Sequence, residues 1–470
     1  MLILPELSLA VASLTFFVLS LTKTDQRLMN NSAVFLGILA VLAACIALPR
    51  TGLLFGNGYA VDAFSQLFKL FITLGLAAVL IFGQDLKDVN HEVRPEYYCF
   101  LFLSGLGLTM LVSSIELLAI FVSLELSSFA LYVLVPLRDD RSGLRVQMEA
   151  GIKYILFGVT ATGFMLFGMS YLFGLSGSTY LPEIMNTLRG LGPQPAVIFA
   201  VAMVLVGFLY KLAIVPFHFW VPDVYQGAAN ETTSFVGTVP KLGAVALLIR
   251  IVQLAAPDNQ TLVTLLGTLA VCSMFYGNLC ALVQKDIKRL LGFSGIAHGG
   301  FVLLGILTLE PLGYATSMYY IFGYVIMSLA CFLVLCKLSV GGENVTVDDL
   351  SGLHRREPLL ALTLTVGLFA LAGIPPFVGF MGKFLLLTGA LAQGHLTLVV
   401  LAAINTAIAI YYYLAMVKVA YTTDEGERPA VQVDGLTRAL SVALIVAMIL
   451  MGVMPSRFVG WAEAAVAALR

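Results

Sequence analysis

Charge is what this sequence has least of. Charged residues make up 11% of its 470 residues, whereas hydrophobic residues make up 60%. Soluble domains carry roughly 25% charged residues, so the composition excludes an ordinary soluble protein and predicts an all-α chain that crosses a membrane many times. The formal net charge of −1 argues against a nucleic-acid partner, because such partners need a basic surface.

The chain also lacks the short motifs that hold metals and nucleotides. None of its six cysteines forms a CxxC pair, so no zinc or iron–sulfur framework is predicted. No GxGxxG occurs, and GFMGK at 379–383 lacks the first glycine and the Ser/Thr of a phosphate loop. We therefore expect no cofactor or metal on this chain. The first apolar segment has no basic start, so we expect it to remain as a membrane span.

Long apolar runs are what the sequence has in abundance. A span needs about 20 apolar residues, and the sequence predicts fourteen spans. Span 7 is interrupted near Pro216 and span 12 at Pro375 and Pro376, so these two helices are predicted to be discontinuous. The expected ranges are 2–21, 31–49, 60–82, 97–113, 115–136, 149–173, 196–220, 231–254, 260–284, 288–309, 313–337, 358–391, 396–421 and 436–455.

Lysine and arginine are distributed unequally between the two sides of these spans. The loops after odd-numbered spans hold most of them, which predicts that these loops face the cytoplasm and that both termini lie outside. The odd-numbered loops hold Lys23, Arg27, Lys87, Arg94, Arg138, Arg141, Arg145, Lys285, Lys288, Arg289, Lys337, Arg355, Arg356, Lys418, Arg428 and Arg438. The opposite side holds Arg50, Arg189, Arg250, Arg457 and Arg470.

The spans also suggest an internal repeat. Spans 4–8 and 9–13 each number five, and the fourth span of each set contains a lysine and a proline break. Because five is odd, the two copies must run through the membrane in opposite directions, which is the pattern of ion-coupled transporters. The predicted parts are three N-terminal spans at 1–96, a first repeat at 97–254, an inverted second repeat at 255–422, and span 14 within 423–470.

Five lysines lie inside the apolar segments: Lys69, Lys153, Lys211, Lys241 and Lys383. An ammonium group in hydrocarbon costs at least about 2.5–3.5 kcal/mol, so a chain that keeps several of them is expected to use them, most simply to move charge. Lys211 and Lys383 adjoin the two proline breaks. Free backbone carbonyls at such breaks survive only beside protein or water, which predicts a proton path near both lysines.

One carboxylate accompanies this row near the middle of a span. Glu125, in SLELSSFALYVL, could pair with a lysine from another span, and the alternative is an ion pair that only fixes helix packing. Lys241 follows Pro240 in span 8, where function is favoured over packing. His298 lies among glycines in FSGIAHGGF, and a relay and a packing role stay equally open for it.

Other polar residues in the spans have simpler interpretations. Lys153 follows Glu149 by one helical turn, so a functional lysine and an interfacial ion pair are both possible. For Lys69, packing or snorkelling to the membrane surface is favoured, and for His218 a structural role. The tyrosine runs at 319–320 and 411–413 are expected to pack or to lie at the membrane interface.

Four motifs, taken together, resemble a known family. They are FLYKLAIVPFHFWVPDVYQGA (208–228), KDIKRLLGFSGIAH (285–298), SLELSSFALYVL (123–134) and AGIPPFVGFMGKF (372–384). The chain resembles the antiporter-like membrane subunits of bacterial NADH:quinone oxidoreductase, respiratory complex I, and PDVYQGA favours the subunit N branch over subunits L and M. The resemblance covers nearly the whole chain. One departure is AANETTS at 228–234, where many relatives have a proline-containing stretch, so the local shape at the start of span 8 stays open.

The resemblance implies a proton-translocating subunit in which a glutamate of span 5 pairs with a lysine of span 7, here Glu125 and Lys211. It implies further relay positions at Lys241, His298 and Lys383, and a matching lysine at Lys153. Other membrane and peripheral subunits, including sibling antiporter-like subunits, would be its partners in a bacterial inner membrane. Those subunits would carry FMN and iron–sulfur clusters and would bind NADH and quinone.

The function expected from these observations is to couple electron transfer in other subunits to proton pumping. Two alternatives stay open. One is a subunit of a multisubunit cation/proton antiporter, and the other is a subunit of a ferredoxin- or deazaflavin-linked or hydrogenase relative of complex I. A scaffold role is a third, but it does not explain why so many charges remain inside the spans.

Overall fold

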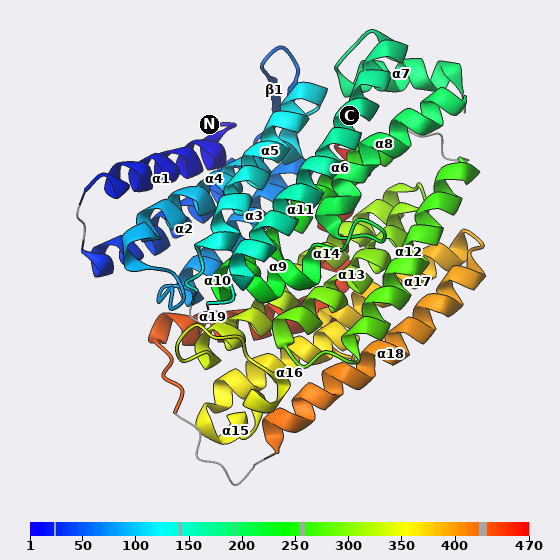
Figure 1. Cartoon of the computed structure of the whole chain (residues 1–470). Coiled ribbons are helices and arrows are strands. Elements are labelled where there is room, and N and C mark those ends of the chain that lie inside the picture. Colours follow the sequence, from blue (N-terminus) through cyan, green and yellow to red (C-terminus); the bar gives the residue numbers. More distant parts are fainter. Residues whose placement is uncertain (23–24, 141–142, 193, 254–258, 423–429, 470) are drawn as a thin grey trace.

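The computed structural model describes residues 1–470 except 23–24, 141–142, 193, 254–258, 423–429 and 470. Within this part the chain is a bundle of packed helices (Figure 1), twelve of which are long and apolar enough to cross a membrane. The predicted all-α membrane fold is confirmed. Helices α1 (Leu4–Ser20), α16 (Pro358–Ala372) and α17 (Val378–Ala392) are apolar but shorter. The count of fourteen spans and the inverted repeat stay predictions.

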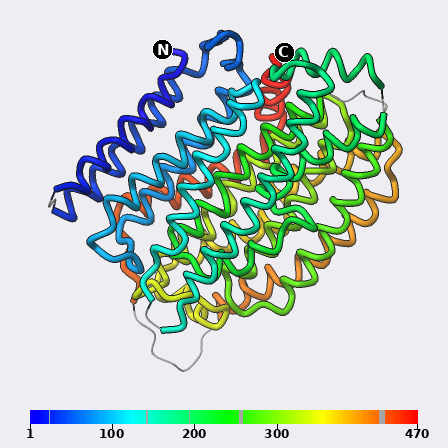
Figure 2. Tube along the Cα trace, turned by 45° about the horizontal axis from the view of Figure 1, so that its top comes forward, coloured from blue at the N-terminus to red at the C-terminus, as the bar shows by residue number. Residues whose placement is uncertain are grey.

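Some of the sequence-based expectations concern residues outside the described part. Lys23, Arg141, Arg428 and Arg470, which contributed to the predicted orientation, lie there. The predicted domain boundaries near 255 and 423 fall there too. Both views place the N-terminus and the C-terminus toward the same end of the bundle (Figures 1 and 2).

The first part of the chain contains three long helices and a small β-hairpin that the sequence analysis did not predict. The hairpin pairs β1 (Gly52–Leu54) with β2 (Tyr59–Val61) in antiparallel register. Its turn uses Phe55, Gly56 and Asn57, all of which have positive φ. The other elements are α1, α2 (Gln26–Ala47), α3 (Ala63–Phe82) and the 3₁₀ turn η1 (His91–Val93).

The middle of the chain forms the helices around the first proline break. These are α4 (Arg94–Ser113), α5 (Leu117–Leu134), η2 (Val135–Leu137), α6 (Val146–Ser176), α7 (Leu181–Leu191), α8 (Pro195–Leu212), α9 (Val221–Gly227), α10 (Asn230–Val236) and α11 (Val239–Val252). The sequence analysis missed α7, which is too short to span a membrane.

The remaining helices follow the same plan around the second break. They are α12 (Gln260–Ala281), α13 (Ile287–Ile306), α14 (Pro311–Leu338), η3 (Val347–Leu350), α15 (Leu353–Arg356), α16, α17, α18 (Leu396–Tyr421), α19 (Gly435–Val453) and α20 (Pro455–Ala467). The sequence analysis did not predict α20, which packs back onto α14 and α3.

Both predicted breaks are present, and a third was not predicted. Helix α8 stops at Leu212 because Ala213 is left-handed, and α9 begins only at Val221. Helix α16 stops at Gly373, whose φ is 86°, and α17 resumes at Val378. The predicted continuous span 231–254 is instead α10 and α11, which meet at Gly237 and Thr238. Pro240 has no backbone N–H to donate, so it is tolerated in the first turn of α11 but not in a helix interior.

Glycines allow neighbouring helix backbones to approach closely. A Cβ placed on Gly168 of α6 would lie 2.6 Å from the backbone nitrogen of Val204 in α8. A Cβ on Gly277 of α12 would lie 2.5 Å from the carbonyl oxygen of Phe293 in α13. Small residues at such interfaces are what lets membrane helices pack tightly without a hydrophobic driving force between them.

We expect Gly168→Val to destabilise the packing of α6 on α8 by about 1–3 kcal/mol, the usual cost of overfilling a packed interface. The measurement is the fraction of this subunit that stays folded after heating the purified, detergent-solubilised protein. Gly163→Val is the matched control, because it lies on the same helix and a Cβ there has nothing within 4 Å. Equal losses in both variants would contradict the close approach.

Candidate functional site

Four of the five lysines predicted inside the spans are buried in the bundle. The exposed fractions of Lys69, Lys211, Lys241 and Lys383 are 0%, 3%, 1% and 4%. Burying an ammonium group requires partners that replace water. The contacts of each lysine therefore indicate what it can do.

Lys211 lies in the last turn of α8, just before the break. Its Nζ donates a hydrogen bond of 2.6 Å to the Ser128 hydroxyl on α5. Glu125 lies three residues before Ser128, on the same face of α5. The Glu125 carboxylate accepts a hydrogen bond of 2.7 Å from Thr162 on α6. The charge of Glu125 acts on Lys211, although the two form no direct ion pair within the part of the chain that the structure describes.

Lys241 lies in the first turn of α11, directly after the unpredicted break. Its Nζ donates to the Gly295 carbonyl of α13 and to the Tyr324 hydroxyl of α14, each at 3.1 Å. The ammonium also lies 4.7 Å from the centroid of the Tyr324 ring, within the range of a cation–π contact. Tyr324 in turn donates to the carbonyl of Gly237 at the break, at 3.3 Å.

His298 lies on α13 between two tyrosines, and it is 4% exposed. Its Nδ1 is 2.6 Å from the Tyr320 hydroxyl of α14, and its Nε2 is 3.1 Å from the Tyr413 hydroxyl of α18. Tyr413 also contacts Ser294 at 2.5 Å. The His298 ring also lies 5.2 Å from the ring of Tyr324, the partner of Lys241. Lys383 lies over the ring of Phe301, which packs against Tyr320, so both lysines adjoin the surroundings of His298. Hydroxyl groups on both ring nitrogens suit a side chain that passes a proton from one to the other.

Lys383 lies on α17 and reaches back across the break. Its Nζ donates to the carbonyl oxygens of Leu371 and Ala372, at 2.9 and 3.1 Å. These are the last carbonyls of α16, which have no partner within that helix because it ends there. A Cβ at Gly373 would lie 3.1 Å from the Lys383 side chain, so the glycine also leaves room for the lysine.

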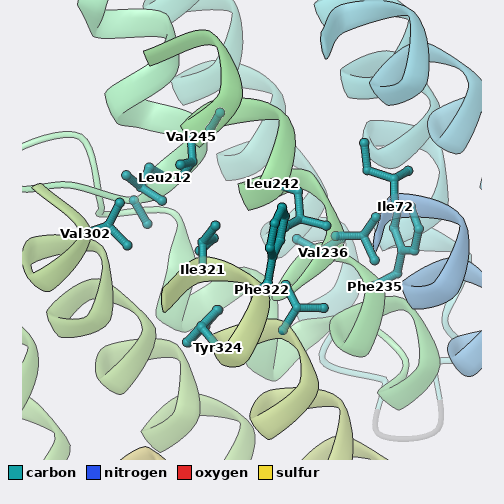
Figure 3. Close-up of a cluster of buried hydrophobic side chains, with 14 of the residues drawn as sticks. Ile72, Leu212, Phe235, Val236, Leu242, Val245, Val302, Ile321, Phe322 and Tyr324 are labelled. Atoms are coloured by element: carbon teal, nitrogen blue, oxygen red, sulfur yellow. The ribbon is translucent and has the colours of Figure 1, made fainter. Parts of the chain in front are cut away.

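Apolar side chains lie beside both Lys211 and Lys241. Leu212 follows Lys211, and Val245 lies one turn after Lys241 on α11. Figure 3 shows Leu212, Val245 and Val302 side by side in a buried hydrophobic cluster. Among the described residues no hydrogen bond joins the Lys211 end of the row to the Lys241 cluster.

Lys153 lies apart from these residues, in a partly exposed ion-pair network. Its side chain is 36% exposed and contacts Glu149 and Asp223, both at 2.6 Å. Asp223 also pairs with Arg289 at 2.7 Å. Burial alone would raise the pKa of the Asp223 carboxyl, but hydrogen bonds from Lys153 and Arg289 outweigh it and hold that pKa below its usual value. The predicted alternative of a Glu→Lys pair is present, and a relay role for Lys153 stays a prediction.

Several polar contacts were not anticipated from the sequence. Lys69 was expected to pack or to snorkel, yet it is fully buried and pairs with Glu6 of α1 at 2.6 Å, so snorkelling is wrong. The Tyr59 hydroxyl donates to the same carboxylate at 2.5 Å. Tyr320 and Tyr413, expected only to pack or to lie at the interface, contact His298. The four-residue spacing of Tyr320 and Tyr324, which places both on one face of α14, was an available signal.

Comparisons with known proteins agree with this architecture. A family model described as "NADH:quinone oxidoreductase/Mrp antiporter, TM" matches residues 114–409. The curated NADH-quinone oxidoreductase subunit N 2 of Opitutus terrae is 52% identical over 454 residues, which are 96% of this chain and 95% of that relative.

Solved structures extend the likeness to three dimensions. A chain of respiratory complex I from Thermus thermophilus with bound Aureothin has a TM-score of 0.84 and 31% identity, over 98% of this chain and all of that chain. A chain of the Mrp complex from Dietzia sp. has a TM-score of 0.87 at 20% identity, over 99% and 97% of the two chains, which shows the shared fold alone. With matches of this identity along almost its whole length, the chain belongs to the antiporter-like membrane-subunit family of NADH:quinone oxidoreductase, in its subunit N group.

Proposed function

We propose that a row of five buried side chains, Glu125, Lys211, Lys241, His298 and Lys383, carries the protons that this subunit translocates. As a member of the subunit N group, the chain is a membrane subunit of a multisubunit oxidoreductase. The observation that carries the proposal is the arrangement of these titratable groups. Each is 7% exposed or less, and they come from α5, α8, α11, α13 and α17. Protons are the cargo that amines, carboxylates and imidazole can pass on without a further cofactor.

The row divides into two parts with different chemistry. At the Lys211 end, the negative charge of Glu125 stabilises the protonated lysine, and moving or neutralising Glu125 would release the proton. At the other end, Lys241, Tyr324, His298 and Tyr320 lie in continuous contact, which supports proton passage toward Lys383. Because no hydrogen bond among the described residues joins these two ends, a proton crossing from Lys211 to Lys241 requires water to bridge them, in surroundings that include the buried apolar side chains of Leu212 and Val245. That step is where coupling to the redox reaction can be imposed.

The proposed direction is from the cytoplasmic side to the outside, with release at or near Lys383. The free energy comes from other subunits, which would oxidise NADH through FMN and iron–sulfur clusters and reduce quinone. Sibling antiporter-like subunits would lie beside this chain in a bacterial inner membrane, with both termini outside the cytoplasm. Lys153, at the partly exposed network with Asp223, would be an accessory lysine.

A cation/proton antiporter subunit is the second candidate, because the Mrp complex chain shares this fold. A ferredoxin- or deazaflavin-linked or hydrogenase relative would share the proton path and differ in the electron donor. Affinity purification of the chain from its native membrane distinguishes these candidate functions. Flavin and iron–sulfur proteins that oxidise NADH would co-purify under the proposed function, whereas an antiporter would bring neither.

Replacing Lys211 tests the proton row directly. We expect Lys211→Ala to slow NADH-driven proton pumping in membrane vesicles at least about tenfold, a modest part of the roughly 10²–10⁴-fold that a positioned proton-transfer group contributes. Complex assembly and NADH:quinone activity are measured in the same vesicles. Lys211→Arg should also slow proton pumping, because a guanidinium keeps the charge but does not release its proton. Normal pumping in assembled Lys211→Ala would show that the lysine takes no part, and normal pumping in assembled Lys211→Arg would show that its charge alone suffices. Either result would contradict the proposal.

The second prediction concerns the hydroxyl between Lys241 and His298. We expect Tyr324→Phe to lower the number of protons pumped per NADH oxidised, because it removes the hydroxyl that accepts from Lys241 while keeping the ring. Tyr319→Phe, on the same helix, is the control, because its hydroxyl donates to the carbonyl of Met451 instead. Equal proton-to-NADH ratios in the two variants would show that the Tyr324 hydroxyl takes no part.

A further inference from the structure

Glu231 is a buried carboxylate that the proton row does not include. It lies in the first turn of α10, in the segment AANETTS, and it is 4% exposed. Its Cγ would be 2.8 Å from a Cβ on Gly83 at the end of α3, so glycine at that position makes room for it. A carboxylate buried this deeply needs a physical reason to be there.

The charged groups around Glu231 come from several elements. Lys288 of α13 and Lys87 of the segment after α3 attract it, and Asp88 repels it. Its charge also acts electrostatically on Arg94, Tyr97 and Tyr98 of α4 and on Cys336 of α14. Three of these groups, Lys87, Arg94 and Lys288, belong to the basic loops, so Glu231 lies at the end of the bundle that is predicted to face the cytoplasm.

An ion pair does not account for this carboxylate. The Lys288 Nζ donates to the Ala228 carbonyl at 2.7 Å, and the Lys87 Nζ donates to the Ser339 carbonyl at 2.6 Å. Among the described residues no lysine or arginine forms an ion pair with Glu231. It therefore differs from Glu6, Asp62 and Asp223, each of which is an ion-pair partner.

A polar stripe leads from Glu231 to Lys241. Ser234, Thr238 and Lys241 follow Glu231 at spacings of three, four and three, in α10, in the break and in the first turn of α11. Ser234 and Thr238 are fully buried. The Thr238 hydroxyl donates to the Ser234 carbonyl at 2.6 Å, and the Ser234 hydroxyl donates to the Asn230 carbonyl at 2.7 Å.

A second, independent feature lies along the same route. The hydroxyl of Tyr225 is fully buried and has no hydrogen-bond partner. It would be 3.0 Å from a Cβ on Gly237, beside the break between α10 and α11. Tyr324 bonds both the Gly237 carbonyl and Lys241. Unsatisfied polar groups in protein interiors mark places where a water or a proton carrier belongs.

We propose that Glu231 is a proton-loading carboxylate that supplies Lys241 from the basic end of the bundle. This inference rests on the proposed proton path and adds an inlet to it. Glu231 takes up a proton from water at that end. The protonated carboxyl passes it along the hydroxyls of Ser234, Thr238, Tyr225 and Tyr324, with water filling the gaps, to the neutral Lys241 amine. The carboxylate that remains is then reprotonated from the same side, and Lys241 delivers its proton toward His298.

The test is Glu231→Gln in the assembled complex, because glutamine keeps the shape beside Gly83 and removes the titratable group. We expect NADH-driven proton pumping in vesicles to slow at least about tenfold, by the same reasoning on proton-transfer groups as for Lys211. The infrared difference spectrum recorded on adding NADH should also lose a carboxyl band in this variant. An unchanged pumping rate, or a spectrum that keeps all its carboxyl bands, overturns the proposal.

A pair of threonine variants gives an answer even if Glu231→Gln does not assemble. Thr238→Val removes a hydroxyl from the stripe and should slow pumping. Thr233→Val is the matched control, because its hydroxyl donates to the backbone carbonyl of Tyr225 at 2.9 Å and bonds no side chain of the stripe. Equal pumping rates in the two variants would overturn the proposal that Glu231 supplies protons along this stripe. If Lys211→Ala abolishes pumping while Glu231→Gln leaves it normal, the inlet alone fails. If both variants pump normally, the proton row fails with it.

Discussion

The need to give every buried ammonium group an oxygen partner shapes this bundle. A lysine in hydrocarbon is tolerated only where polar atoms replace its water. Regular helices offer few, because most of their carbonyls already bond within the helix. Lys383 binds two carbonyls at the end of α16, whereas Lys241 binds the Tyr324 hydroxyl and one carbonyl inside α13, that of Gly295. The broken helices therefore help to supply the oxygen atoms that the buried charges need.

The three breaks serve this requirement in different ways. The end of α16 frees two carbonyls that hold Lys383, and Gly373 gives the lysine room. The end of α8 places Lys211 against the Ser128 hydroxyl of α5. The break at Gly237 leaves a carbonyl that binds Tyr324, which in turn contacts Lys241. Each break thus lies next to a lysine, and together they connect α8, α11, α13, α14 and α17 around the buried charges.

The buried charged groups lie in separate parts of the bundle. Glu6 and Lys69 form a pair near the N-terminal end of α1, while Glu125 and Lys211 lie between α5 and α8. Leu212, the residue after Lys211, lies with Val302 in a buried hydrophobic cluster (Figure 3). Charges interact over longer distances when the medium between them is apolar, so neighbouring groups can influence one another without a hydrogen bond.

The sequence by itself determined the membrane class, most of the helices, the breaks in spans 7 and 12, and the lysines and histidine that are buried. These follow from composition, from apolar length and from proline, all of which act locally along the chain. The sequence did not reveal the break at Gly237, the pairing of Lys69 with Glu6, or the tyrosines that contact His298. Only the tertiary structure decided these, because helical periodicity gives the face on which a side chain lies but not which distant helix that face meets.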